Sequence, residues 1–117
     1  MNIMKDIIVR DKSFEFAVRV INLDIYLRKV KKEYVLSKQI VRSGTSVGAS
    51  IEEASGAVSH ADFKNKLCIA YKEARETHYW LKLLHRTKLI DEKIFTSLEF
   101  DCEELKKILY TIIKGLK

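Results

Sequence analysis

The sequence contains no proline and only four glycines among its 117 residues. Proline interrupts a helix because it removes a backbone donor and clashes with the preceding turn. Its absence therefore favours an all-helical chain with short connections. The two cysteines, Cys68 and Cys102, are too few for a disulfide framework and form no CxxC pair, so we expect both to be reduced and buried.

Long apolar runs are also missing. No stretch approaches the ~20 apolar residues of a membrane-spanning helix, and the N-terminal MNIMKDIIVRDK lacks the sustained apolar segment of a secretory signal. We therefore expect a bacterial, cytoplasmic protein with no membrane partner. A chain of 117 residues that is 47 % hydrophobic has the size of one domain and can bury its own core.

Apolar residues recur at alternating steps of three and four along four segments, which is the spacing of one helix face. The predicted helices are at about 12–33, 37–57, 60–87 and 92–115. Ser37, Ser59 and Asp91 are suitable capping residues at the start of the last three. Because the connections are short, consecutive helices should be antiparallel neighbours. The sequence thus predicts a single-domain, all-α, antiparallel up-down-up-down four-helix bundle.

Two of these helices carry features that a simple bundle does not require. In the first, Phe14, Val18, Ile21 and Ile25 form a second apolar line beside the core positions. In the second, Gly44 and other small residues occupy the middle, where each glycine costs about 1 kcal/mol relative to alanine. Small residues let a neighbouring backbone approach closely, either within the bundle or in another subunit.

The third predicted helix has apolar residues outside its core face. At 100° per residue, Ile69, Trp80 and Leu83 lie well away from the core positions, with Glu73 and Glu76 among them. We interpret this flank as a subunit interface with Trp80 as its anchor, because buried aromatic residues often dominate interface energetics.

The net charge of +6 is unevenly distributed. In an antiparallel bundle, the end that holds the first and third connections would collect ten basic residues and only three acidic ones, and the remainder would be nearly neutral. A segregated basic surface is typical of nucleic-acid binding through phosphate contacts, although a solvated end without a partner is the simpler alternative. The candidate phosphate-binding residues are Arg28, Lys29, Lys31, Lys32, Lys38, Arg42, Arg75, Lys82 and Arg86.

Signatures of catalysis are absent from the sequence. Facing Glu-x-x-His pairs, which build the di-metal sites of helical bundles, do not occur, and neither a phosphate loop nor a nucleophile elbow is present. His78 and His85 share a helix face but would need further ligands to hold a metal. We therefore expect no enzymatic activity, no catalytic residues, no metal and no cofactor.

Three segments resemble a known family. They are FEFAVRVINL at 14–23, LSKQIVRSGTSVGASIEEA at 36–54 and SHADFKNKLCIAYKEARETHYWLKLL at 59–84, and they are similar to the bacterial 23S rRNA intervening-sequence proteins. Ser50 departs from the pattern, in which asparagine is expected. The resemblance implies a homopentamer of antiparallel four-helix bundles. It also implies similarity to the accessory protein of diversity-generating retroelements, a basic pentameric barrel that binds nucleic acid and a reverse transcriptase.

Two functional hypotheses follow. The first is a non-enzymatic, oligomeric protein that binds RNA or DNA through its basic surface. The second is a protein–protein scaffold or accessory subunit without direct nucleic-acid binding, whose partner would be another protein such as a reverse transcriptase.

Overall fold

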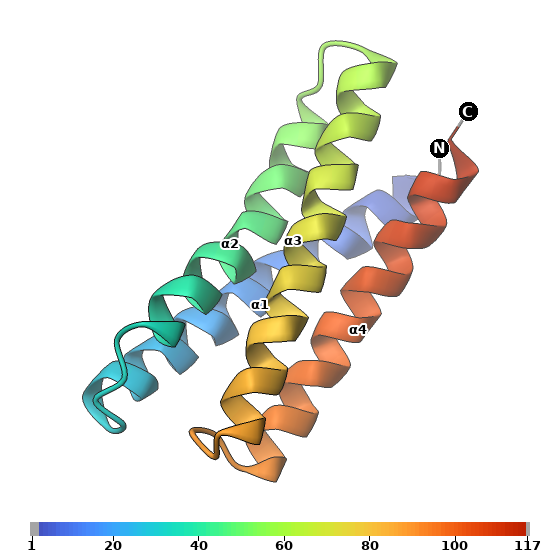
Figure 1. Cartoon of the computed structure of the whole chain (residues 1–117). Coiled ribbons are helices and arrows are strands. Elements are labelled where there is room, and N and C mark those ends of the chain that lie inside the picture. The colour runs from blue at the N-terminus through green and yellow to red at the C-terminus, as the bar shows by residue number, and fades with distance from the viewer. Residues whose placement is uncertain (1–2, 117) are drawn as a thin grey trace.

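A computed structural model describes the backbone of residues 3–116 and the side chains of residues 6–116. It contains four helices, α1 (Ile3–Lys29), α2 (Leu36–Ser55), α3 (His60–Arg86) and α4 (Glu92–Gly115), and no strand within the described range. Each helix runs antiparallel to the one before it (Figure 1). α2 packs against α1 and α3, and α4 packs against α3 and α1. The predicted four-helix bundle is confirmed.

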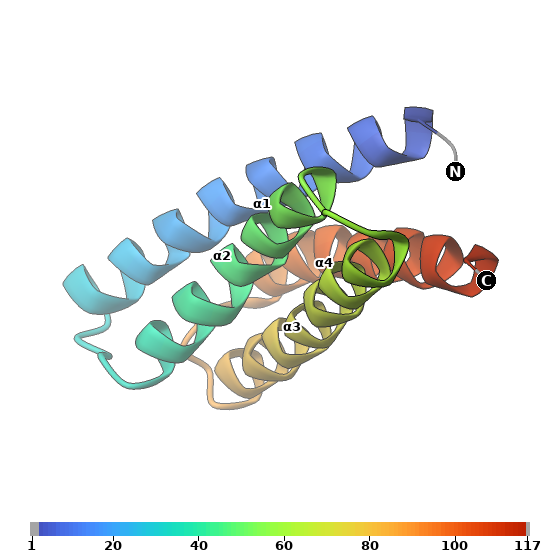
Figure 2. The same cartoon turned by 90° about the horizontal axis from the view of Figure 1, so that it is seen from above.

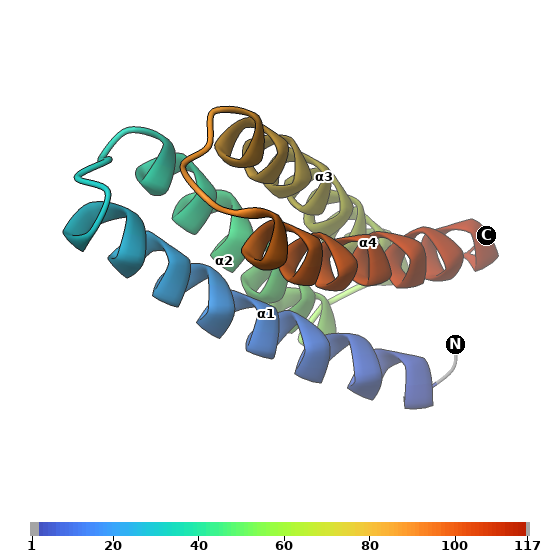
Figure 3. The same cartoon turned by 90° about the horizontal axis from the view of Figure 1, so that it is seen from below.

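The connections of the bundle lie at two opposite ends. The α1–α2 and α3–α4 turns are together at one end, as the views from above and from below show (Figure 2 and Figure 3). The α2–α3 turn, the start of α1 and the end of α4 lie at the other (Figure 1). Among the described residues, no helix combines the length and the apolar character needed to cross a bilayer.

The core lies along the predicted apolar rows. α1 contributes Phe16, Val20, Leu23 and Leu27, all 5 % exposed or less. The rows of the other helices are likewise buried, and α3 places the small residues Ala70 and Ala74 and the polar Thr77 at its centre. Val30 and Tyr34 follow the last residue of α1 and are exposed, and Phe63 and Phe95, in the first turns of α3 and α4, are half-buried.

The predicted bounds of the first helix were wrong at both ends. α1 begins at Ile3 rather than near residue 12, and it ends at Lys29 rather than at 33. Ser13, next to the predicted start at residue 12, is buried inside the helix, where its hydroxyl donates to the carbonyl of Arg10 at 3.0 Å. Val9 continues the buried row one heptad before Phe16. α1 ends because the chain turns through Lys32, which has a φ of 55°.

The start of α2 also differs from the prediction. Ser37 does not cap the helix but lies within its first turn, fully buried. The carboxylate of Glu33 instead accepts hydrogen bonds from the backbone N–H groups of Val35, Leu36 and Ser37 at 2.9–3.1 Å. A single side chain before the helix therefore satisfies three donors that the first turn leaves without carbonyl partners.

The predicted caps of the last two helices are confirmed. Ser59 accepts from the N–H of Asp62 at 3.0 Å, and Asp91 accepts from the N–H of Ile94 at 2.8 Å. The side chain of Asp62 in turn accepts from the N–H of Val58 at 3.3 Å, so the chain is held on both sides of the α3 start.

α1 has two apolar faces. Opposite its buried row, Ile7, Phe14, Val18, Ile21 and Ile25 expose between 36 and 68 % of their surface. The second apolar line of this helix therefore points away from the core. A helix that is apolar on both sides is usually covered on both sides, and within one chain nothing among the described residues covers the outer row of α1.

The two glycines of α2 lie against α1. A Cβ added at Gly44 would lie 2.7 Å from Cγ1 of Val20, and one at Gly48 would lie 3.3 Å from the carbonyl oxygen of Ser13. The absence of side chains at these positions therefore allows α1 and α2 to pack closely. Of the two roles that the sequence allows for these glycines, packing within the bundle is the one that the structure shows.

We predict that Gly44→Ala lowers the free energy of unfolding by about 1–2 kcal/mol, because overpacking at a fully buried, β-branched Val20 outweighs the helix propensity of alanine. Urea unfolding measures this change. The matched background is Val20→Ala, which removes the two methyl groups that the new Cβ would meet. In that background Gly44→Ala should lower the free energy of unfolding only slightly, or should raise it. An equal loss of unfolding free energy in both backgrounds would contradict the proposed contact.

Candidate functional site

The end of the bundle with the α1–α2 and α3–α4 turns, which we call the basic end, carries ten cationic side chains. Among the described residues, only Arg28 and Arg42 of these ten form ion pairs with carboxylates. The other eight have no acidic partner within residues 6–116 and are exposed: Lys29, Lys31, Lys32, Lys38, Lys82, Arg86, Lys88 and Lys93. Six of these eight were predicted as phosphate ligands, and the structure brings them to one end.

Arg28 is held within α1. Its guanidinium donates to both carboxylate oxygens of Asp24 at 3.0–3.2 Å. The hydrogen bonds to Asp24 and its negative charge raise the pKa of Arg28 above its ordinary value. Arg28 therefore adds less to the surface potential than the free lysines beside it.

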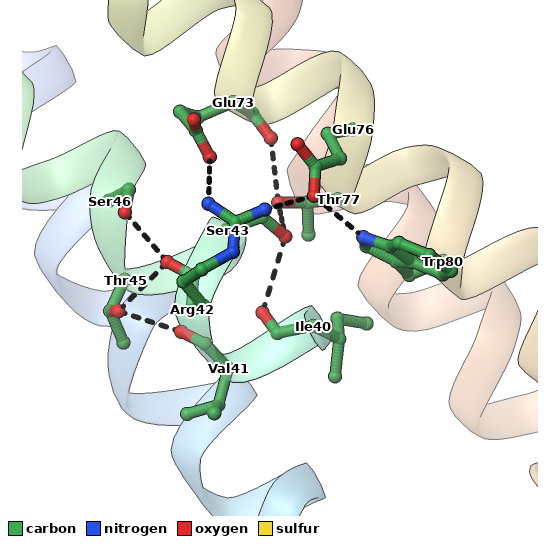
Figure 4. Close-up of polar contacts among 10 residues, drawn as sticks. All are labelled: Ile40, Val41, Arg42, Ser43, Thr45, Ser46, Glu73, Glu76, Thr77 and Trp80. Carbon is green, nitrogen blue, oxygen red and sulfur yellow. Dashed lines mark hydrogen bonds and ion pairs between the residues drawn. The ribbon is translucent and has the colours of Figure 1, made fainter. Parts of the chain in front are cut away.

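Arg42 joins α2 to α3. Its guanidinium lies between Glu73, at 3.3 Å, and Glu76, which it contacts closely (Figure 4). Beneath this pair, the hydroxyl of Thr77 donates to that of Ser43 at 2.9 Å in the buried part of the same helix contact. Arg42 is thus a structural link between helices, and its charge is neutralised by two carboxylates.

Glu76 also holds Trp80. The indole N–H donates to the Glu76 carboxylate at 2.9 Å (Figure 4). This hydrogen bond, followed by the contacts with Arg42, lowers the pKa of Glu76 below its ordinary value of 4.5, against the opposing effect of burial. Trp80 is half-buried and packs against the core.

The remaining predicted interface and charge positions of α3 are spread over its surface. Ile69 is 37 % exposed, and Leu83 is half-buried. Arg75 lies in the middle of the helix with its guanidinium 5.9 Å from the ring centre of Tyr71, rather than at the basic end. The exposed apolar character of this flank comes from Ile69 and from Tyr79, which is 52 % exposed.

The acidic groups of the basic end are engaged within the chain. Glu33 and Asp91 accept from backbone N–H groups at the starts of α2 and α4. Glu92 lies 3.3 Å from Nε2 of His85 and accepts from the hydroxyl of Thr96 at 3.1 Å. The three carboxylates therefore serve helix starts and neighbouring side chains, and they leave the lysines free.

A hollow of about 350 Å³ opens at this end, between the two turns. We call it the two-turn hollow; its lining residues are Tyr26, Lys31, His85, Lys88, Leu89, Ile90, Asp91 and Glu92. Of these, only Lys31 was predicted as a site residue. The other members are contributed mainly by the α3–α4 turn and the helices beside it. The topology predicts that the two turns share one end, but no spacing in the sequence indicates which of their residues line a common hollow.

Cys102 and His78 are held in the contact between α3 and α4, whereas Cys68, which was expected to be buried, is half-buried. Burial raises the pKa of the Cys102 thiol to about 12, so this side chain is not a nucleophile near neutral pH. His78 lies between two α4 carboxylates, with Nε2 2.9 Å from Glu99 and Nδ1 2.9 Å from Glu103. Because these acids approach opposite nitrogens, they do not converge with the ring on one point. Across residues 6–116, no three His, Cys, Asp or Glu side chains form a group suited to a metal ion.

Comparison with known proteins identifies related sequences. The family model described as 23S rRNA-intervening sequence protein matches residues 5–111. A crystal structure of a protein with unknown function from the S23 ribosomal protein family of Bacteroides thetaiotaomicron is 56 % identical, with a TM-score of 0.93. The match covers 95 % of this chain and 99 % of that one. No curated protein matches the chain.

We predict that the fluorescence of Trp80 reports the protonation of Glu76. As the pH falls, the emission of this single tryptophan should change in a step with a midpoint below 4.5, since the Glu76 pKa is lowered. The stability that the Glu76 carboxylate provides is present above pH 4.5 and is lost as the pH falls through the lowered pKa.

The control for this titration is the neighbouring acid. Glu76→Gln should abolish the step, whereas Glu73→Gln should preserve it, because Glu73 contacts Arg42 but not the indole. A step that persists in Glu76→Gln, or whose midpoint lies above 4.5, would contradict the assignment.

Proposed function

The chain belongs to the 23S rRNA-intervening sequence protein family, and from this and its basic end we propose that it is a non-enzymatic, self-associating protein that binds RNA or DNA. The observation that carries the proposal is the group of eight cationic side chains without acidic partners at one end of the bundle. Phosphate groups would serve as the partners of these cations.

The distribution of ion pairs supports this proposal. Along the body of the bundle, basic and acidic residues are nearly equal in number, and five of the ten described cations form ion pairs, as in Arg10–Glu52 at 3.2 Å and Lys66–Glu53 at 2.9 Å. At the basic end the free cations come from the end of α1, the turns and the facing parts of α2, α3 and α4. Such a surface attracts polyanions over a distance of the order of the Debye length, about 10 Å at 0.1 M salt.

The contacts would be made with the sugar–phosphate backbone. Lysine side chains on flexible stems neutralise phosphates but carry little sequence information. The proposed contact set is therefore the eight free residues. Arg28 and Arg42 are excluded from it because carboxylates already neutralise them, and Arg75 is excluded because it lies away from the end.

Self-association is proposed from the apolar surface. The exposed row of α1 has the heptad spacing of a coiled-coil seam, with Asp11 as its one polar member. The exposed Ile69 and Tyr79 lie on α3, which is not in contact with α1. Two apolar flanks on different helices suit a head-to-tail contact, in which α1 of one copy meets α3 of the next and the assembly closes as a ring.

The scaffold alternative uses the same surface. If the outer row of α1 receives a different protein, the chain would be an accessory subunit and its copies would remain separate. The mass of the isolated protein distinguishes the two possibilities, because only self-association buries the row without a second polypeptide.

We predict steeply salt-dependent binding to an RNA hairpin or a DNA duplex at ~50 mM salt. Lys82→Gln/Arg86→Gln should reduce the slope of log K against log salt by about two, one for each phosphate that the variant no longer neutralises. The matched control is Lys107→Gln/Lys114→Gln on α4, which removes the same charge far from the basic end and should leave the slope unchanged. The absence of binding, or equal reductions of the slope in both variants, would refute the proposal.

We predict that Phe14→Glu and Ile69→Glu each reduce the native mass to that of the 13.6 kDa chain, as measured by light scattering. Each variant keeps one intact flank. Mixing the two should therefore yield a dimer of twice that mass, through α1 of the Ile69 variant and α3 of the Phe14 variant. Two monomeric variants that do not pair on mixing would rule out the head-to-tail contact, and a monomeric wild type would favour the scaffold alternative.

A further inference from the structure

The two-turn hollow has a composition unlike the rest of the basic end. Lys31 comes from the α1–α2 turn and Lys88 from the α3–α4 turn, so cations from distant parts of the chain line one cavity. Neither lysine forms an ion pair among the described residues, although Asp91 and Glu92 line the same cavity. Those two acids are engaged by the N–H of Ile94 and by His85 and Thr96.

Aromatic rings form another part of the hollow. The imidazole of His85 stacks on the ring of Phe95, with centroids 4.2 Å apart and planes 6° from parallel. His85 lines the hollow with a side chain that is 33 % exposed, and the half-buried Tyr26 lines it from α1. A flat ring that is already supported on one face is a suitable platform for a second flat group, because stacking depends on a fixed orientation.

We propose that the two-turn hollow receives one unpaired nucleotide, with its phosphate between Lys31 and Lys88 and its base against the ring of His85. This inference rests on the proposed nucleic-acid binding and specifies which part of the polymer the basic end recognises. The volume of about 350 Å³ is at the lower end of the range for small-molecule sites, ~300–1,000 Å³, and suits one nucleotide rather than a helix.

The nucleotide must be outside a base-paired stem. A stacked and paired base presents only its edge to a protein, whereas a bulged, looped or terminal base offers a face for stacking. The six other free cations, outside the hollow, would then hold the flanking phosphates of the stem. The ligand class is therefore a structured nucleic acid with an extruded nucleotide, and not a uniform duplex.

The test compares two fluorescein-labelled RNA hairpins, one with a fully paired stem and one with a single bulged nucleotide, by fluorescence anisotropy. The wild-type protein should bind the bulged hairpin about tenfold more tightly, which is the scale of one base–aromatic stack. Lys31→Gln/Lys88→Gln and, separately, His85→Ala should bring this ratio close to one. Circular dichroism melting establishes that each variant is folded.

The matched control is Lys38→Gln/Lys93→Gln, which removes two free cations of the same end that do not line the hollow. It should weaken both hairpins equally and keep the tenfold ratio. Equal wild-type binding to the two hairpins with steep salt dependence would overturn the nucleotide site and leave the proposed function intact. Failure to bind either hairpin would overturn both the nucleotide site and the proposed function. A tenfold ratio that persists in the His85 and Lys31/Lys88 variants would contradict the site, because the bulged nucleotide would then be recognised outside the hollow.

Discussion

The close packing of α1 against α2 at Gly44 and Gly48 is the constraint on which the arrangement of the bundle depends. The glycines remove the side chains that would hold the helices apart, and the opposite side of α2 meets α3 through the Ser43–Thr77 hydrogen bond and the Arg42 ion pairs. α2 is thus fixed between two neighbours at both of its faces. The α1–α2 turn and the α3–α4 turn lie at the same end of the bundle (Figure 2 and Figure 3), and residues of both line the two-turn hollow.

Charge and packing are separated along the bundle. Ion pairs such as Lys12–Glu104 at 3.1 Å and Lys66–Glu53 at 2.9 Å join neighbouring helices in its body. Exposed pairs of this kind contribute only about 0–1 kcal/mol each, and the body is nearly neutral because its basic and acidic residues are nearly equal in number. The uncompensated charge is then confined to one end. A polyanion approaching from any direction would be oriented toward that end before contact.

The sequence predicts the fold well and the site only in part. Heptad spacing locates all four helices because one face of each is buried, and Ser59 and Asp91 mark helix starts by local chemistry. The start of α1 has no such marker. Ser13, next to the predicted start, lies inside the helix, where its hydroxyl donates to a backbone carbonyl. The neutralisation of Arg42 by Glu73 and Glu76 depends on which turns of α2 and α3 face each other. The two-turn hollow depends on how two connections lie relative to each other. Neither relation is encoded in local spacing.

Two of the lysines at the basic end occupy unfavourable backbone conformations. Lys32 and Lys88 have φ values of 55° and 64°, in the left-handed region of backbone conformation. Glycine and asparagine adopt this region readily, whereas other residues destabilise the fold there by roughly 1 kcal/mol. Selection for thermodynamic stability alone would favour glycine at both. A long cationic side chain at each of these positions therefore adds surface charge at the expense of folding stability, and Lys88 does so in the lining of the two-turn hollow.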